Sequence, residues 1–229
     1  MATRPARHLS TNLPIAQTLD VYDREAETFL TRWGKGKYKR PPLLNEWLRM
    51  IPKGSQLLDL GCGAGQDTRY LRSIGHRVIG LDHTLPLLAF ASRRSSTLPY
   101  VLGDIRTIPI ADDCLDGVWA AASLIHLPKP VARLVFAELA KCVRPGGLFA
   151  ATITQGRSSG IKTRGWMPGR FFARWQKDEL ARALSQAGWQ VLSLRVVHNR
   201  ERKGRWINAI AERVGSRSAR SVRVSATVL

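Results

Sequence analysis

The stretch from Leu57 to Leu71 constrains the fold of this chain more than any other part of the sequence. It reads as an apolar strand, then three glycines at alternate positions (Gly61, Gly63 and Gly65), then a helix with an apolar face. Glycine has no Cβ, so the backbone can turn sharply after the strand and a flat ligand can approach the main chain closely. The stretch therefore predicts an α/β domain with a nucleotide-type ligand at the glycine loop.

From Gln56 onward, short apolar strands alternate with helical patterns. Strands are expected at Leu57–Leu60, Val78–Leu81, Tyr100–Leu102, Leu115–Ala120, Leu148–Thr154, Trp189–Val197 and about Arg205–Ala211. Helices are expected at Asp20–Trp33, 41–51, 66–74, Leu85–Ala91, Pro130–Val143 and Asp178–Ala187. This alternation is typical of a parallel sheet that helices cover on both faces.

The length of 229 residues fits one α/β domain and is too short for two ordinary ones. We expect a disordered arm over residues 1–19, a domain over residues 20–212 that opens with a helical lid at 20–54, and a basic, disordered tail over 213–229. Residues 155–176 contain four glycines, five basic residues and four aromatic ones without any period. This composition predicts a long substrate loop over the edge of the sheet, because long loops in compact domains are usually functional or disordered.

The chain carries a formal net charge of +19, and its basic residues gather toward the C-terminal end. A surplus of this size favours polyanionic partners such as RNA, DNA or anionic lipid headgroups. An arginine-rich composition spread over a solvated surface gives the same total. Charge alone leaves both interpretations open, and it bears on association rather than on chemistry.

Three widely spaced cysteines, Cys62, Cys114 and Cys142, indicate neither a disulfide framework nor a zinc site, and they favour a reducing compartment. No apolar run approaches the roughly 18 residues of a membrane span, and no secretory segment opens the chain. We therefore expect a cytoplasmic protein without a metal. The first 19 residues lack acids, as transit peptides do, but Pro5 and Pro14 oppose the amphipathic helix of such a peptide.

The spacing of the glycines separates the kinds of nucleotide ligand. Gly-x-Gly-x-Gly is one residue shorter than the dinucleotide fingerprint, so a nicotinamide enzyme is a minor alternative, and the Gly-Lys-Ser/Thr ending of a phosphate loop is absent. Asp59 precedes the loop and a second strand stops at Asp82, so two carboxylates flank the glycines. Asp82 can accept both hydroxyls of a ribose, as the acid of dinucleotide folds does, or it can cap the helix that follows.

Five blocks of sequence together resemble the class I S-adenosylmethionine-dependent methyltransferases, and among them the type 11 and ubiquinone-biosynthesis-like group. The blocks are Asp-x-Gly-x-Gly-x-Gly from Asp59, Val-Ile-Gly-Leu-Asp ending at Asp82, Gly-Asp-Ile at 103–105, Leu-Asp-Gly-Val at 115–118, and residues 139–148. One glycine loop is weak evidence, whereas the ordered set, which covers about residues 20–212, is strong. The resemblance implies a Rossmann-like, mostly parallel seven-stranded sheet with an antiparallel last strand, and S-adenosyl-L-methionine as the cofactor.

The resemblance also implies a cofactor site. Asp59 and the glycine backbone are expected to hold the methionine end, Asp82 the ribose, and Asp104 with the backbone of Ile105 the adenine, on which His83 stacks. Asp104 can instead be a turn residue. The full expected set is Asp59, Gly61, Cys62, Gly63, Gly65, Asp82, His83, Asp104, Ile105 and Ala121.

The acceptor side is less clearly marked in the sequence. His126 is the titratable side chain nearest to where an acceptor approaches, because ligands sit outside the carboxyl ends of the strands. It is a weak candidate for a catalytic base, and the alternative is a wall or packing role. Further substrate candidates are Tyr22 and Arg32 in the lid and Trp166 and Arg170 in the long loop.

These features predict a methyltransferase whose acceptor is a small metabolite. The sequence from Arg170 onward also resembles enzymes that methylate a carboxymethyl group on the wobble uridine of tRNA, in which case the basic loop and tail would bind phosphates and Trp166 or Trp175 would stack on a base. Alternatively, these aromatic residues pack the lid onto the sheet. A nucleic-acid-binding protein without turnover is a third hypothesis, which the intact carboxylates of the cofactor site oppose.

Overall fold

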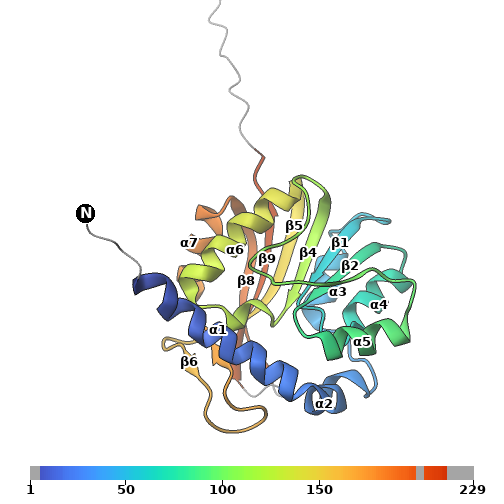
Figure 1. Ribbon diagram of the computed structural model, residues 1–229. Helices are drawn as coiled ribbons and strands as arrows, with labels where there is room; N and C mark the ends of the chain where they lie inside the picture. Colours follow the sequence, from blue (N-terminus) through green and yellow to red (C-terminus); the bar gives the residue numbers. More distant parts are fainter. Residues whose placement is uncertain (1–5, 200–203, 216–229) are drawn as a thin grey trace, which may run out of the picture.

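A seven-stranded sheet forms the centre of the molecule in the computed structural model, which describes residues 6–199 and 204–215 (Figure 1). The strand order is β3-β2-β1-β4-β5-β9-β8. The bounds are β1 (Gln56–Leu60), β2 (Arg77–Asp82), β3 (Tyr100–Leu102), β4 (Leu115–Ala121), β5 (Val143–Thr154), β8 (Trp189–Asn199) and β9 (Gly204–Arg213). β9 is antiparallel to β5 and to β8, whereas the other neighbouring strands are parallel. The Rossmann-like, mostly parallel sheet with an antiparallel last strand is thus confirmed.

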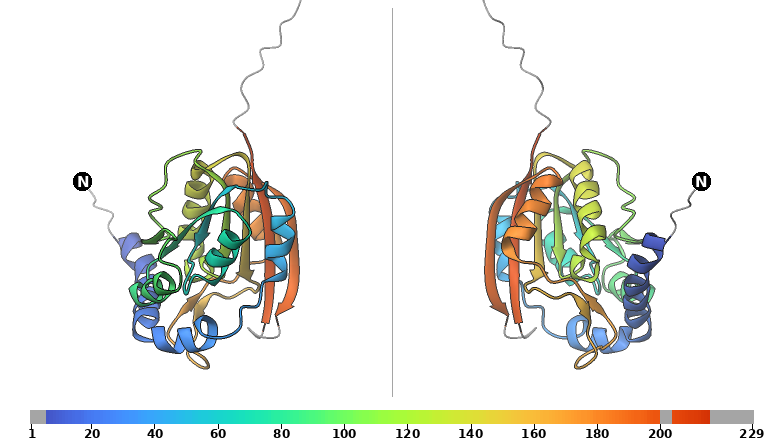
Figure 2. Two further views of the ribbon diagram at one scale, coloured as in Figure 1. Left: turned by 90° about the vertical axis from the view of Figure 1, so that its right-hand side faces the viewer. Right: turned by 90° about the vertical axis from the view of Figure 1, so that its left-hand side faces the viewer.

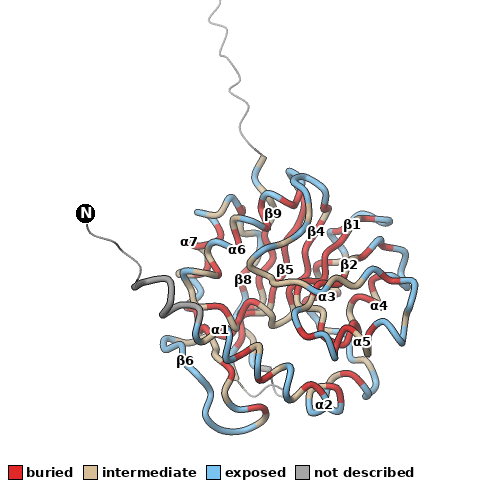
Figure 3. Tube along the Cα trace, viewed as in Figure 1, coloured by how far each residue is buried: buried red, intermediate tan, exposed pale blue. Residues whose placement is uncertain are grey.

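Helices cover both faces of the sheet (Figure 2). α6 (Lys129–Cys142) and α7 (Lys177–Gln186) pack on one face, and α3 (Pro42–Leu48) and α4 (Gln66–Ser73) pack on the other. α5 (Leu85–Arg94) follows β2. Neighbouring residues of β1 point to opposite faces of the sheet. Leu58 packs in the core beneath α6 and α7, and Leu57 packs in the core beneath α3 and α4. Burial on both faces explains why these strands read as nearly continuous apolar runs (Figure 3).

The N-terminal segment differs from the prediction. α1 spans Ala6–Arg24, so the expected disordered arm over 1–19 is wrong from residue 6 onward, and residues 1–5 lie outside the described residues. Pro14 lies inside the helix and has no N–H to donate. Thr18, one turn later, is buried and anchors the helix, because its hydroxyl donates to the Pro14 carbonyl (2.8 Å) and accepts from the Phe171 N–H (2.9 Å). Tertiary contacts therefore stabilise a helix that its internal proline disfavours.

The lid continues with α2 (Ala26–Phe29) and a π-helical turn, η1 (Leu30–Gly34). Together with α1 it lies beside the carboxyl ends of the parallel strands (Figure 1). None of the described helices is long and apolar enough to cross a membrane.

The long segment at 155–176 is not irregular throughout. It holds a small antiparallel hairpin of β6 (Gly160–Ile161) and β7 (Phe171–Phe172). The hairpin escaped prediction because two-residue strands show no period. At the other end of the domain β9 runs to Arg213, one residue beyond the expected end of the domain, and residues 216–229 lie outside the described part of the chain.

Candidate functional site

A cavity of about 1380 Å³ lies at the carboxyl edge of the sheet, beneath the lid and the 155–176 segment. Pockets for one small ligand commonly measure about 300–1,000 Å³, so this cavity has room for a cofactor and an acceptor. Most of the predicted site residues line it: Asp59, Gly61, Cys62, Gly63, Asp82, His83, Asp104, Ile105, Ala121, His126, Tyr22, Arg32, Trp166 and Arg170. Gly65 does not. It precedes α4, and a Cβ there would lie 2.5 Å from the Tyr100 hydroxyl, so its role is to let the loop pack closely.

Asp59 is the penultimate residue of β1, and Asp82 is the last residue of the neighbouring strand β2. Asp82 Oδ2 accepts the Gly63 N–H (2.8 Å) and Oδ1 accepts the Thr84 N–H (2.9 Å). Each oxygen keeps a second lone pair, so Asp82 organises the glycine loop and can still accept from a ligand. Asp59 is 2% exposed, and its Oδ2 accepts from the Thr68 hydroxyl at 2.6 Å. Neither carboxylate forms an ion pair with a described residue.

Burial makes these two acids unusual. It raises the pKa of Asp59 well above 3.8, and the negative charge of Asp67 adds to the effect against the opposing hydrogen bond from Thr68. Burial also raises the pKa of Asp82, although the backbone hydrogen bonds from Thr84 and Gly63 oppose it. Burial, together with the negative charges of Asp82 and Asp59, raises the pKa of the Cys62 thiol, which stays protonated. This half of the cavity therefore favours a cationic ligand.

The raised pKa of Asp59 predicts a gain in stability when its charge is removed. The folded state binds the proton more readily than the unfolded state, so the free energy of unfolding falls as pH rises from 3.8 toward the raised pKa. We expect Asp59→Asn to raise the free energy of unfolding of the ligand-free protein by about 1 kcal/mol at pH 7.5, and by less at pH 4.5. Urea denaturation at both pH values measures this, with the exposed Asp112→Asn as control. Equal stability of Asp59→Asn and wild type at pH 7.5 would contradict the argument.

Asp104 is held by Arg106. Its carboxylate accepts from the Arg106 backbone N–H (2.8 Å) and from the guanidinium Nε (2.8 Å). Partial burial opposes ionisation, but the hydrogen bonds and charge of Arg106 dominate and lower the pKa of Asp104 below 3.8. The acid is therefore ionised at neutral pH and fixed at the wall of the cavity.

Tyr22 connects three segments in the other half of the cavity. His126 Nδ1 lies 2.7 Å from the carbonyl of Phe171, which can only accept, so Nδ1 carries the proton of the neutral ring. Nε2 is then the acceptor for the Tyr22 hydroxyl at 2.9 Å. That hydroxyl in turn accepts from Arg170 Nη1 at 3.0 Å. The chain of hydrogen bonds joins α1, η2 (Leu124–His126) and the segment before β7.

Comparison with known proteins agrees with this geometry. Residues 58–151 match the methyltransferase domain family Methyltransf_11. The chain is 36% identical over 118 residues to the malonyl-[acyl-carrier protein] O-methyltransferase of Pectobacterium atrosepticum. The aligned region covers 49% of this chain and 45% of the relative. It is 28% identical over 187 residues to an uncharacterized methyltransferase of Synechocystis, covering 74% of this chain and 85% of that one. Residues 58–151 of this chain are thus similar to a methyltransferase domain, and the relatives named above are methyltransferases.

The cofactor of this family is S-adenosyl-L-methionine, in agreement with the prediction from the glycine loop. A solved structure of similar fold is the 1,6-didemethyltoxoflavin-N1-methyltransferase of Burkholderia thailandensis with bound 1,6-didemethyltoxoflavin and S-adenosylhomocysteine. Its TM-score is 0.68 at 17% identity, covering 94% of this chain and 93% of that one. The chain spans less than half the length of the malonyl-[acyl-carrier protein] relatives that it matches, so their acceptor is a property of those proteins.

Several residues line the cavity without having been predicted. Ser123 lies two residues after β4, and Thr152 lies near the end of β5. Their buried hydroxyl oxygens have no hydrogen-bond partner among the described residues. Asn208 lies opposite Thr152 in the register of β5 and β9. Asp67 accepts from the Tyr38 hydroxyl (2.6 Å) and the Trp119 indole (2.8 Å) at the cofactor end. Single hydroxyl and amide residues within strands carry no sequence signal, so only the sheet order could have found them.

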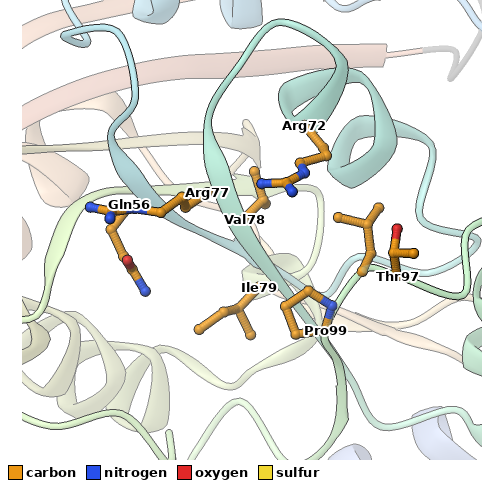
Figure 4. A pocket seen from close by; sticks show the side chains of 8 residues that line it. Gln56, Arg72, Arg77, Val78, Ile79, Thr97 and Pro99 are labelled. Atoms are coloured by element: carbon orange, nitrogen blue, oxygen red, sulfur yellow. The ribbon is translucent and has the colours of Figure 1, made fainter.

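A second, smaller pocket of about 170 Å³ lies at the opposite edge of the sheet, where β1, β2 and β3 begin (Figure 4). Its lining includes Gln56, Arg72, Arg77 and Pro99. Asp116, at the same edge, accepts the Gln56 N–H at 2.7 Å and pairs with Arg144, which agrees with its omission from the predicted site. Ligands of open α/β sheets bind at the carboxyl edge, so the large cavity is the functional candidate.

Proposed function

We propose that this chain transfers a methyl group from S-adenosyl-L-methionine to a small-molecule acceptor. The observation that carries the proposal is one cavity with two chemically distinct halves. The carboxylates of Asp59, Asp82 and Asp104 line the first half, and the Tyr22, His126 and Arg170 chain of hydrogen bonds lies in the second. The family supports the reaction class, and the acceptors named for two of the similar proteins support a small-molecule or carrier-bound substrate.

The residues of the first half fit the cofactor. S-Adenosyl-L-methionine has a sulfonium, an ammonium group and a ribose diol but no phosphate, so carboxylates rather than lysines suit it. We assign Asp59 to the ammonium group and the two free lone pairs of Asp82 to the ribose hydroxyls. Asp104 and the backbone of Ile105 are assigned to the adenine, and His83 to its face.

Bound S-adenosyl-L-methionine supplies a methyl group that its sulfonium has already activated, so the main task of the protein is alignment. Tyr22 and Arg170 line the acceptor half and are held to each other by a hydrogen bond. The Nε2 lone pair of His126 is engaged by the Tyr22 hydroxyl. In this arrangement His126 orients Tyr22 rather than taking a proton from the acceptor.

Transfer of a radioactive methyl group tests the proposal directly. The protein is incubated with tritiated S-adenosyl-L-methionine and, separately, with a small-molecule cell extract or with bulk tRNA. We expect label in the small-molecule fraction and not in tRNA. The proposal would be overturned if neither fraction carried label and calorimetry detected no binding of S-adenosylhomocysteine. Preferential binding of NADH would instead favour a nicotinamide enzyme.

One observation favours tRNA as a second candidate acceptor. Exposed cations stand at the rim of the cavity, namely Arg32, Lys37, Lys39 and Lys162. Label in tRNA would select this alternative, and RNA binding must then weaken with salt because phosphate contacts release counterions. In either case the free thiols of the three cysteines fit a cytoplasmic reaction.

A further inference from the structure

Arg170 is a buried cation without an acidic partner. Its side chain is 4% exposed, and it lines the acceptor half of the cavity. Its guanidinium donates to the carbonyls of Met167 (3.0 Å) and Trp166 (2.9 Å) and to the Tyr22 hydroxyl (3.0 Å), all of which are neutral. It forms no ion pair with any described carboxylate. Buried charges in proteins are normally paired, so a counter-ion is missing here.

The number of donors indicates what the counter-ion is. A guanidinium has five N–H groups, and the three hydrogen bonds of Arg170 use one each on Nε, Nη1 and Nη2. One N–H on each Nη nitrogen remains. Two such donors match the two oxygens of a carboxylate, which arginine commonly binds through paired hydrogen bonds.

The described residues around Arg170 do not supply that charge. The rings of Tyr22, Trp166 and Phe172 lie 5.3, 4.7 and 5.3 Å from the guanidinium carbon. Aromatic faces attract a cation but carry no net charge. The aspartates that line the cavity belong to the cofactor half, and Glu46, the glutamate among its lining residues, pairs with Arg195.

We propose that the methyl acceptor is a small carboxylic acid whose carboxylate binds the two remaining N–H groups of Arg170. The inference rests on the proposed function and names the class of its substrate. The aromatic rings around Arg170 then contact the flat, apolar part of the acid. The two halves of the cavity become complementary to two ligands, the carboxylates to a cationic cofactor and the guanidinium to an anionic acceptor.

A purely mechanical role is the competing explanation, because the hydrogen bond to Tyr22 ties the 155–176 segment to α1 and the other two hold that segment together. The two roles are separated by calorimetry with benzoate and its uncharged analogue benzamide, each in the presence of saturating S-adenosylhomocysteine. We expect wild type to prefer benzoate at least about tenfold. Arg170→Gln should lose that preference while its affinity for benzamide stays within about threefold. Arg164→Gln removes an exposed arginine of the same segment that does not line the cavity, so it serves as the matched control and should keep the preference.

Equal losses of benzoate and benzamide binding in Arg170→Gln would indicate the mechanical role and overturn the proposal, as would the absence of a preference in wild type. A measurement on the unaltered side chain guards against misfolding of the variant. The Nε–H resonance of Arg170, identified by its loss in Arg170→Lys, should shift saturably with benzoate and not with benzamide. An unmoved resonance overturns the proposal. Binding of S-adenosylhomocysteine alone is measured in parallel, so failure of the cofactor assignment is distinguishable from failure at Arg170.

Discussion

Replacing Asp82 by alanine is expected to weaken the binding of S-adenosylhomocysteine by at least about 100-fold, as measured by calorimetry. The carboxylate has two tasks at once. It accepts the backbone N–H groups of Gly63 and Thr84, which holds the glycine loop beside the end of β2. Its remaining lone pairs are assigned to the two ribose hydroxyls. Each hydrogen bond to a charged group contributes about 1.5–3 kcal/mol, so loss of both ribose contacts accounts for the expected fall.

The loop task and the ribose task can be separated by a second variant. Asp82→Asn keeps one side-chain oxygen, so it should retain part of the affinity and bind more tightly than Asp82→Ala. Asp112→Ala removes an exposed acid outside the cavity and should bind like wild type. Affinity for S-adenosylhomocysteine within about threefold of wild type in Asp82→Ala would refute the assignment of this carboxylate to the cofactor.

Gly61→Ala is expected to be the most damaging single-methyl change in the glycine loop. The residue has φ of +74°, which an L side chain rarely adopts, and a Cβ would overlap the Ser123 side chain after β4. Backbone strain of about 1–2 kcal/mol and overpacking of about 1–3 kcal/mol both act against the variant. We expect the free energy of unfolding to fall by about 3 kcal/mol in urea denaturation, with loss of cofactor binding.

Gly54→Ala provides a matched control for this effect. Its φ of +76° is nearly the same, but no atom lies within 4 Å of the added Cβ. The control therefore carries the backbone strain alone, and its free energy of unfolding should fall by about 1–2 kcal/mol with cofactor binding retained. Equal destabilisation by both substitutions would show that close packing of the loop against Ser123 is unimportant.

The parts of the fold that local patterns specify were predictable from the sequence. Alternating apolar strands and helices indicated the parallel sheet, because each pattern is set by residues close together in the chain. The ends of β1 and β2 placed Asp59 and Asp82 at one edge, where both line the cavity. Their roles toward the cofactor remain proposals that the variants above test.

What escaped prediction depends on contacts between distant residues. Pro14 made a helix before residue 20 look unfavourable, and only burial of Thr18 against β7 stabilises it. The isolation of Arg170 from carboxylates likewise becomes visible only when α1 and the 155–176 segment come together. Composition showed that this segment is basic, but not that one of its arginines is buried among aromatic rings.

The Tyr22 contacts described above also bear on the order of folding. Tyr22 and His126 are 104 positions apart, Tyr22 and Arg170 are 148 apart, and Thr18 and Phe171 are 153 apart. Contacts of such separation are costly to form early in folding, because each must close a long loop. The sheet can therefore complete its own pairing before the acceptor half of the cavity exists. Opening of that half costs the sheet none of its strand pairs, which leaves a route for ligands to enter and leave without unfolding the core.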